Sequence, residues 1–393
     1  MDFETVKQKE SAYVMNTYGR APICFVKGEG CTLYDSTGKS YIDLTSGIGV
    51  NALGHNHPEL VEAISNQAAT LMHVSNLYYT EPMVEVAEKL AKGSGLKKVF
   101  FANSGAEANE GLIKCARKYS SDKYGNDRFV ILSLKQSFHG RTMNTLKATG
   151  QAKFHQWFYP FPEGFDYVIA NDFEDFKAHV NEHVCAVMME MIQGEGGVLP
   201  LDKDFVQQVS AYCKERDILV CVDEVQTGIG RTGTLFAYQQ FGIEPDIISI
   251  AKGLGGGFPI GGFMVGEKCE YTMQPGQHGS TFGATPLGCE AANVVLKTVD
   301  TPEFLQAVKE KGDYFMNGIR SFQSENIKDV RGMGLMIGII VDPEKRADYV
   351  NNLRDKGILV LTAGLDAIRL LPPLVISYDE IDASLSIMKE IFE

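Results

Sequence analysis

The sequence lacks the features that would place the protein in a membrane, on a nucleic acid or outside the cell. No apolar run approaches the length of a membrane span, and the first thirty residues have no signal-peptide stretch. Positive charge is scarce, because 37 Lys and Arg face 50 Asp and Glu, which gives a net charge of -13. Nucleic acids and anionic membranes would repel such a chain, which leaves small molecules and proteins as the expected partners.

The sequence also lacks paired cysteines and metal-binding motifs. Its eight cysteines contain no CxxC pair, and several stand inside apolar runs. This pattern favours buried thiols, and a reducing cytoplasm is the expected location. A P-loop and an HExxH motif are absent as well. The segment GHNHP (54–58) looks metal-like at first, but two histidines flanked by Gly and Pro are expected to form a loop, so no metal is expected.

The chain does contain a series of short apolar runs. The seven runs are KKVFFAN (97–103), RFVILSL (128–134), DYVIA (166–170), CAVMMEMI (185–192), ILVCVDEV (218–225), DIISIAK (246–252) and GGFMVGE (261–267). Helical patterns lie between them, for example over 107–119 and 204–216. Strands that are apolar on both faces and separated by helices predict an α/β fold with a mainly parallel sheet covered on both sides.

The length of 393 residues and the 44% hydrophobic content predict a large core and two domains. After about Cys289 the pattern changes to a long helix, three apolar runs and a final helix from Tyr378. We therefore expect a large domain over 51–288 and a smaller α+β domain over 289–393. The N-terminal segment, 1–50, is expected to join the small domain.

Ligands of parallel sheets bind at the carboxyl ends of the strands, and chemically reactive residues gather there in this chain. In SGAEANE (104–110) a strand turns into a helix, whose free N-H groups and macrodipole can hold a phosphate. An ordinary helix cap is the alternative interpretation of this segment.

Two further strand ends carry an acid and an amine. Asp223 in VDEVQTG (222–228) closes an apolar strand, where a carboxylate needs a cationic partner such as a pyridinium N-H. Lys252 in SIAKG (249–253) follows the next strand, where partial desolvation would ease imine formation with an aldehyde. The alternatives are an acid that caps a turn and a surface lysine. A separation of 29 residues fits one strand-helix-strand step, so the two side chains are expected at neighbouring strand ends.

One motif competes with this interpretation, because Gly228 to Gly233 matches GxGxxG and follows a strand. It would suggest a nicotinamide dinucleotide site. However, the preceding strand ends in two carboxylates that would repel a pyrophosphate, and no clean strand-end acid follows about twenty residues later. A dinucleotide-dependent oxidoreductase is therefore disfavoured.

Taken together, the motifs resemble those of the class III, or ornithine-type, pyridoxal-phosphate aminotransferases, and within that class the acetylornithine branch. The resemblance runs nearly end to end and rests on nine ordered segments. They are GEGCTLYDSTGKSYIDL (28–44), ALGHNHP (52–58), FFANSGAEANE (100–110), SFHGRT (137–142), IQGEGGV (192–198), DEVQTGIGRTG (223–233), AKGLGGGFPIG (251–261), HGSTFG (278–283) and RLLPPL (369–374). It implies a fold type I transferase with a seven-stranded sheet, with pyridoxal 5'-phosphate as cofactor.

The resemblance also implies which residues hold the cofactor. Backbone N-H groups of Gly105 and Ala106 would bind its phosphate, and Thr281 would reach that phosphate from the neighbouring subunit of a homodimer. Phe138 and Val225 would pack on opposite faces of the pyridine ring.

Four residues complete the implied cofactor site. Gln226 would bond the ring hydroxyl, Asp223 would hold the protonated ring nitrogen, and Glu224 belongs to the same set. Lys252 would form the imine and then move a proton between the substrate carbon and the cofactor carbon.

The resemblance implies two arginines for two unlike substrates. Arg141 would bind the α-carboxylate of acetylornithine, or the side-chain carboxylate of glutamate, while Arg369 would bind the α-carboxylate of glutamate. Glu195 would mask Arg369 when no second carboxylate is present, and Ser280 would lie beside the amino donor. An ordinary structural ion pair is the alternative for each arginine. Ile48 stands where ornithine enzymes carry a Tyr, which favours an acylated donor.

The expected reaction is transfer of the δ-amino group of acetylornithine to 2-oxoglutarate in arginine biosynthesis. Two departures from the family pattern, Met191 and Gly283-Ala284-Thr285, do not touch the cofactor chemistry. The second is expected near the subunit contact, where it would alter donor preference. Ornithine, succinylornithine, succinyl-diaminopimelate and 4-aminobutyrate are alternative donors. An isomerising relative would not need both arginines, and a non-catalytic binding protein would show no cofactor absorbance.

Overall fold

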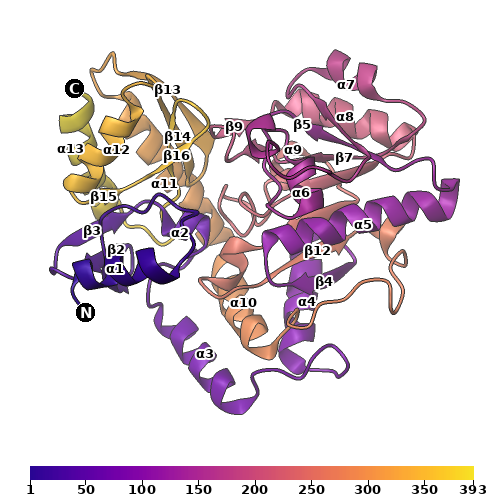
Figure 1. Ribbon diagram of the computed structural model, residues 1–393, viewed down its shortest axis with the longest axis horizontal. Coiled ribbons are helices and arrows are strands. Elements are labelled where there is room, and N and C mark those ends of the chain that lie inside the picture. Colours follow the sequence, from indigo (N-terminus) through magenta and orange to yellow (C-terminus); the bar gives the residue numbers. More distant parts are fainter.

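The seven apolar runs form one seven-stranded sheet in the computed structural model, which describes residues 1–393 (Figure 1). In sheet order the strands are β4 (Lys98–Ala102), β12 (Gly261–Val265), β11 (Ile247–Ile250), β10 (Leu219–Asp223), β7 (Val184–Met189), β5 (Val130–Leu134) and β6 (Phe165–Val168). β12 alone runs opposite to the other six strands. The mainly parallel sheet expected from the sequence is therefore confirmed.

Both faces of this sheet are buried, because side chains alternate between two cores. On β10, Leu219 and Cys221 belong to the core that also contains residues of α5 (Gly105–Tyr124). Val220 and Val222 belong to the larger core on the opposite face. Burial on both faces explains why the runs are apolar at every position rather than at every second one.

Helices connect and cover these strands. They are α3 (Pro58–Thr70), α4 (Glu81–Ser94), α5, α6 (Met143–Ala148), α7 (Phe173–His179), α8 (Lys203–Glu215), α9 (Tyr238–Phe241), α10 (Pro286–Val299) and the short turns η1 (Ala152–Phe154), η2 (Lys252–Gly255) and η3 (Glu267–Cys269). α5 and α8 match the helical patterns expected over 107–119 and 204–216. No helix combines the length and the apolar character needed to cross a bilayer.

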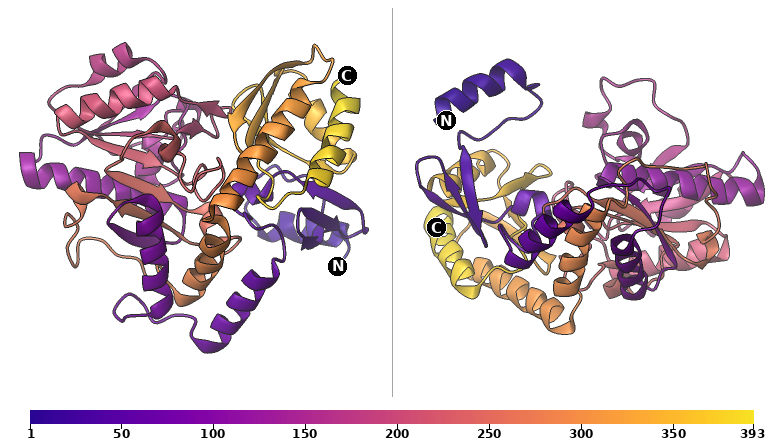
Figure 2. Two further views of the ribbon diagram at one scale, coloured as in Figure 1. Left: turned by 180° about the vertical axis from the view of Figure 1, so that it is seen from behind. Right: turned by 90° about the horizontal axis from the view of Figure 1, so that it is seen from below.

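The N-terminal and C-terminal segments lie together beside the large sheet, and Figure 2 shows both chain ends on that side. Their elements are α1 (Phe3–Tyr13), β1 (Phe25–Glu29), β2 (Thr32–Asp35), β3 (Ser40–Asp43), α2 (Ser46–Gly49), α11 (Pro302–Arg320), β13 (Ile327–Met333), β14 (Met336–Val341), α12 (Arg346–Asp355), β15 (Ile358–Leu359), β16 (Leu361–Ala363), β17 (Ala367–Leu370) and α13 (Tyr378–Phe392). β15 pairs with β3, so a C-terminal strand completes the N-terminal sheet. A two-stranded ribbon, β8 (Ile192–Gln193) and β9 (Leu199–Pro200), lies after β7. The domain limits at 50/51 and 288/289 stay predictions, and the second falls inside α10.

The single long helix expected after Cys289 is wrong, because the structure has two helices there. α10 ends at Val299, and α11 begins at Pro302 with Thr301 as its N-cap. The Thr301 hydroxyl accepts a hydrogen bond from the N-H of Phe304 at 3.3 Å. Proline has no N-H to continue the first helix but suits the first turn of the second.

Candidate active site

A cavity of about 440 Å³ lies at the carboxyl ends of the central strands. The predicted site residues that line it are Gly105, Ala106, Phe138, Arg141, Glu195, Asp223, Val225, Gln226 and Lys252. They come from the ends of β4, β5, β7, β10 and β11 and the segments that follow. Lys252 and Asp223 thus face one cavity, although 29 residues separate them, because β10 and β11 are parallel neighbours.

Lys252 begins η2 directly after β11 and has a φ of 44°, a strained angle for a residue with a Cβ. Burial lowers the pKa of its amine to about 8, against the opposing effect of the Glu195 carboxylate. An amine with this pKa is uncharged in a useful fraction of molecules near neutral pH, and only the uncharged form attacks a carbonyl carbon. Lys252 is therefore suited to act as a nucleophile.

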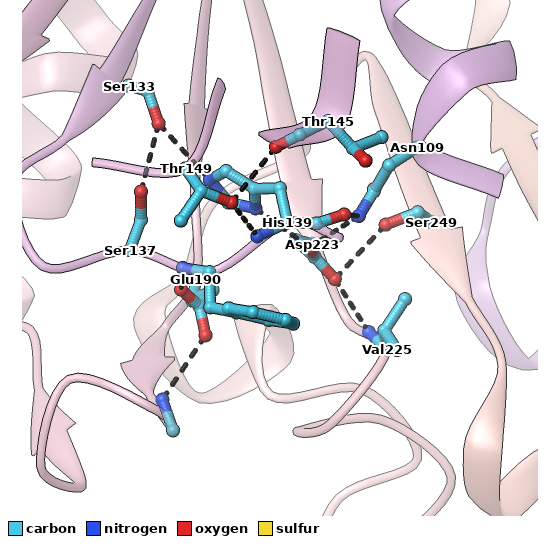
Figure 3. Close-up of polar contacts among 12 residues, drawn as sticks. Asn109, Ser133, Ser137, His139, Thr145, Thr149, Glu190, Asp223, Val225 and Ser249 are labelled. Carbon is cyan, nitrogen blue, oxygen red and sulfur yellow. Dashed lines mark hydrogen bonds and ion pairs between the residues drawn. The ribbon is translucent and has the colours of Figure 1, made fainter. Parts of the chain in front are cut away.

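Asp223 ends β10 and is held by four donors around its carboxylate (Figure 3). One oxygen accepts from Asn109 Nδ2 at 2.7 Å and contacts His139 Nδ1 at 2.8 Å. The other accepts from the N-H of Val225 at 3.0 Å and from the Ser249 hydroxyl at 3.2 Å. Burial alone would raise the pKa of Asp223, but His139 and the other donors hold it below its usual value. The side chain therefore presents a negative charge to the cavity.

The start of α5 forms one wall of the cavity. Ser104 is its N-cap, and its hydroxyl accepts from the N-H of Glu107 at 3.2 Å. The first N-H groups of a helix have no partner within the helix and attract anions. A Cβ on Gly105 would lie 2.7 Å from Val225 Cγ1, so glycine is required where the helix start meets Val225. Backbone N-H groups and room for a phosphate thus coincide at Gly105 and Ala106.

The two predicted arginines differ in their partners. Arg369 is 2% exposed, and its Nη1 contacts Gly194 O at 2.9 Å, Glu195 Oε1 at 2.7 Å and Gln226 Oε1 at 3.0 Å. Its Nε is buried without a partner, so it can donate to a further acceptor. Arg141 is exposed, has no carboxylate partner, and lies 4.5 Å from the ring centroid of Phe154. The structural ion pair considered as an alternative is present for Arg369 and absent for Arg141.

Five of the predicted residues do not line this cavity, and Arg369, which lies behind Glu195 and Gln226, is one of them. Glu224 points away from it, and its carboxylate accepts from the N-H of Tyr238 at 2.8 Å, while burial raises its pKa to about 7. Ser280 and Thr281 line a neighbouring hollow of about 310 Å³. Ile48 lies on α2 and is 44% exposed.

Sequence reasoning gave no role to four buried polar residues at this site. They are Asn109, His139, Glu190 and Ser249. Glu190 accepts from the N-H of Phe138 at 2.8 Å and from that of Gly194 at 3.2 Å, and burial raises its pKa to about 7. A carboxylate inside the apolar run CAVMMEMI was the available signal, because a charged residue there needs partners.

The GxGxxG segment does not bound the cavity. A Cβ on Gly230 would lie 2.4 Å from Val299, and one on Gly233 would lie 2.2 Å from Lys309. Both neighbours belong to the helices α10 and α11, so these glycines allow close packing. Helix packing therefore accounts for these two glycines, and the segment lies outside the cavity.

Comparison with known proteins gives the same family along the whole chain. The family model for class-III aminotransferases matches residues 13–392. The acetylornithine aminotransferase of Haemophilus ducreyi is 48% identical over 393 residues, covering 100% of this chain and 99% of that protein. That of Methanocaldococcus jannaschii is 44% identical and covers 98% of this chain and 96% of its own length.

Solved structures agree with this result. The ornithine aminotransferase of Toxoplasma gondii superposes with a TM-score of 0.95 at 29% identity, covering 100% of this chain and 95% of that one. The N-acetylornithine aminotransferase of Stenotrophomonas maltophilia has a TM-score of 0.84 at 35% identity, with coverage of 98% and 97%. By sequence and by fold, the chain belongs to the class-III aminotransferases.

Proposed function

We propose that this enzyme transfers the δ-amino group of N2-acetyl-L-ornithine to 2-oxoglutarate, giving N-acetylglutamate 5-semialdehyde and glutamate, in arginine biosynthesis. The observation that carries the proposal is the full-length similarity, at 42–49% identity, to relatives named acetylornithine aminotransferase. Two arginines support it, because the reaction needs sites for one carboxylate in the donor and two in the acceptor. Arg141 lines the cavity, and Arg369 contacts Glu195 and Gln226, which line it.

The cavity fits pyridoxal 5'-phosphate at both of its charged ends. The start of α5 at Gly105 and Ala106 would hold the phosphate, and the carboxylate of Asp223 would hold the ring nitrogen in its protonated form. When bound, the cofactor withdraws electrons from the substrate carbon that loses a proton. Lys252 is the amine that would take the cofactor aldehyde and later carry that proton.

Ring placement is assigned to three further residues. Phe138 and Val225 would cover the two ring faces, and Gln226 would bond the ring hydroxyl while its Oε1 accepts from Arg369. Glu190 fixes the backbone of Phe138 from behind, through the N-H that it accepts at 2.8 Å.

Substrate binding is assigned to the arginines. Arg141 would bind the α-carboxylate of acetylornithine or the side-chain carboxylate of glutamate. Glu195 Oε1 lies 2.7 Å from Arg369 Nη1, and Glu195 would rotate away when the α-carboxylate of glutamate binds. The unpartnered Nε of Arg369 would donate to the same α-carboxylate. The neutral acetamide of acetylornithine needs no cation, so the ion pair between Glu195 and Arg369 can remain intact when that substrate binds.

Steady-state assays with four donors test the substrate. The donors are acetylornithine, succinylornithine, ornithine and 4-aminobutyrate, each with 2-oxoglutarate as acceptor. We expect the highest kcat/KM with acetylornithine. In ornithine the free α-ammonium would lie near the Arg141 guanidinium, which has no carboxylate partner, and the two positive charges would repel each other. A higher kcat/KM for ornithine or 4-aminobutyrate would reject the assignment.

Replacing Gly105 with Ala should weaken cofactor binding. The new Cβ would lie 2.7 Å from Val225 Cγ1 and would push that side chain toward the ring position. Overpacking of this kind costs about 1–3 kcal/mol, so the dissociation constant should rise about tenfold or more. Titration of the apoenzyme with pyridoxal phosphate measures this dissociation constant. Gly19→Ala is the control, because no atom lies within 4 Å of a Cβ added there. If both variants bound pyridoxal phosphate with the same affinity, the assignment of the phosphate to Gly105 and Ala106 would be wrong.

Cofactor uptake should depend on pH through Lys252. Because burial lowers the pKa of this amine to about 8, its uncharged fraction rises about tenfold per pH unit up to pH 8 and then levels off. The rate of apoenzyme reconstitution should follow the same curve. Stopped-flow absorbance between pH 6 and 9.5 measures it, and a rate still rising tenfold per unit near pH 9.5 would indicate an ordinary lysine.

A homodimer in the cytoplasm is part of the proposal. Ser280 and Thr281 lie beside an exposed apolar patch, and Thr281 would complete the phosphate site of the partner subunit. The patch consists of Met72, Leu77, Tyr78, Tyr79 and Phe282, which are 57–97% exposed. Large exposed apolar patches mark protein interfaces. Light scattering should give twice the mass of 43.2 kDa. The eight free cysteines, seven of them buried, suit a reducing compartment.

A further inference from the structure

The short helix α2 is a left-handed turn. Its four residues, Ser46 to Gly49, have φ angles of 42°, 63°, 67° and 77°. Glycine adopts such angles freely, but Ser46 and Ile48 carry a Cβ, and for a β-branched residue like Ile48 the conformation is an outlier. Strain of this kind persists only where the surroundings hold the chain in place, and it gathers at functional sites.

One set of contacts forms the turn from the side of β3. Asp43 ends that strand and is fully buried. One of its oxygens accepts from the N-H and the hydroxyl of Thr45, at 2.8 and 2.7 Å, and from the N-H of Ser46 at 3.0 Å. The other contacts His55 Nε2 at 2.8 Å. The chain is therefore bent into the turn by a single buried carboxylate.

A second set of contacts joins the turn to the strand that carries Arg369. The hydroxyl of Ser46 donates to Leu371 O at 2.5 Å, and the N-H of Leu371 donates to Leu44 O at 2.7 Å. Leu371 directly follows β17, two residues after Arg369. Both backbone polar groups of Leu371 are thus bonded to the segment that contains the turn.

A third contact joins the turn to the loop of Lys252. A Cβ added to Gly253 would lie 3.7 Å from Gly49 O, so the turn lies beside this loop with room for about one methyl group between the two backbones. Val50, the next residue, lines the central cavity together with Lys252. The turn therefore lies between the end of β17, which carries Arg369, and the start of η2, which carries Lys252.

We propose that Ser46 is a positioning residue, which through Leu371 sets where the Arg369 guanidinium stands relative to Lys252. The inference rests on the proposed function, in which Arg369 receives the α-carboxylate of glutamate. Without the Ser46 hydroxyl, the carbonyl of Leu371 loses its side-chain donor, and only the bond from the N-H of Leu371 to Leu44 O still joins this segment to the end of β17. The end of β17 then moves away from η2, and a carboxylate held by Arg369 no longer places the α-carbon of glutamate against the Lys252 amine.

The test is Ser46→Ala in the full-length holoenzyme, with the two half-reactions followed separately by the absorbance of the bound cofactor. We expect kcat/KM for glutamate to fall about tenfold, mainly through KM, and kcat/KM for acetylornithine to stay within twofold, since that donor does not use Arg369. Ser65→Ala is the matched control, because the Ser65 hydroxyl also donates to a backbone carbonyl, that of Val61, but on the exposed helix α3. Equal losses with both substrates, or no loss with either, would overturn the proposal.

Hydrogen exchange separates this inference from the proposed function, because it needs no substrate. In Ser46→Ala, exchange should quicken in residues 367–374 and 252–258 relative to the wild type and to Ser65→Ala. Unchanged exchange in both segments would refute the positioning role even if glutamate turnover fell. Conversely, the wild type could reject acetylornithine while Ser46→Ala shows the expected faster exchange. That result would refute the proposed substrate and leave the positioning role in place.

Discussion

Replacing Lys252 with Ala should reduce transamination by several orders of magnitude and remove the absorbance band of the lysine-bound cofactor. Lys252 supplies the one amine at the cavity, with a pKa lowered to about 8 by burial. It is proposed both to take the cofactor aldehyde and to carry the proton, and general acid–base catalysis alone contributes up to about 10⁴-fold. We therefore expect kcat to fall by about 10⁴-fold. Overnight assays with acetylornithine and 2-oxoglutarate can measure residual rates of that size.

The control for this variant must lose a lysine without touching the cavity. Lys92→Ala suits the purpose, because Lys92 pairs with Glu88 on the exposed side of α4 and its side chain is 75% exposed. Its activity should equal that of the wild type. Added methylamine should restore part of the proton transfer in Lys252→Ala, since a free amine can replace the lost one in the cavity. Normal turnover in Lys252→Ala would refute the assigned role.

The central sheet could be predicted because its strands are buried on both faces. Leu219, Val220, Cys221 and Val222 alternate between two cores, so every position in the run is apolar and the run ends where the cavity begins. The same geometry made the meeting of Asp223 with the Lys252 loop predictable, since consecutive parallel strands present their carboxyl ends at one edge. These inferences need only local composition and the rule of right-handed crossovers.

The partners of Asp223 could not be predicted in the same way. His139, Asn109 and Ser249 come from three different segments, and which atoms meet depends on how α5 and the segment after β5 pack onto the sheet. The acid pair raised a similar problem. Successive residues of a strand point to opposite sides, so Asp223 enters the cavity and Glu224 turns to the N-H of Tyr238.

Backbone conformation was the other source of error. The positive φ angles of Ser46 and Ile48 carry no sequence signal, because neither residue type favours the left-handed region. The break between α10 and α11 did carry a signal in Thr301-Pro302, which resembles a helix start more than a helix interior. The acid pair before the GxGxxG segment already argued against phosphate binding there, but the packing role of its glycines against α10 and α11 could be recognised only in the structure.

Replacing Arg369 with Ala should separate the two substrates of the enzyme. Its Nη1 contacts Glu195 at 2.7 Å, and its unpartnered Nε is free for a second acceptor. Loss of a buried charge-assisted partner costs about 2–5 kcal/mol, and Glu195 would remain as an unpaired negative charge facing the glutamate carboxylate. We expect kcat/KM for glutamate to fall by about 10²–10³-fold, whereas kcat/KM for acetylornithine should fall less than fivefold. Single-turnover absorbance with each substrate measures both values.

Arg141→Ala is the matched comparison, because both substrates are assigned a carboxylate on Arg141. That variant should lose activity with glutamate and with acetylornithine to a similar degree. Arg369→Lys keeps the charge but not the planar fork, so its loss with glutamate should lie between those of the wild type and Arg369→Ala. If Arg369→Ala lost activity equally with both substrates, Arg369 would have a structural role at the cavity. The proposed assignment of the α-carboxylate of glutamate to Arg369 would then be wrong.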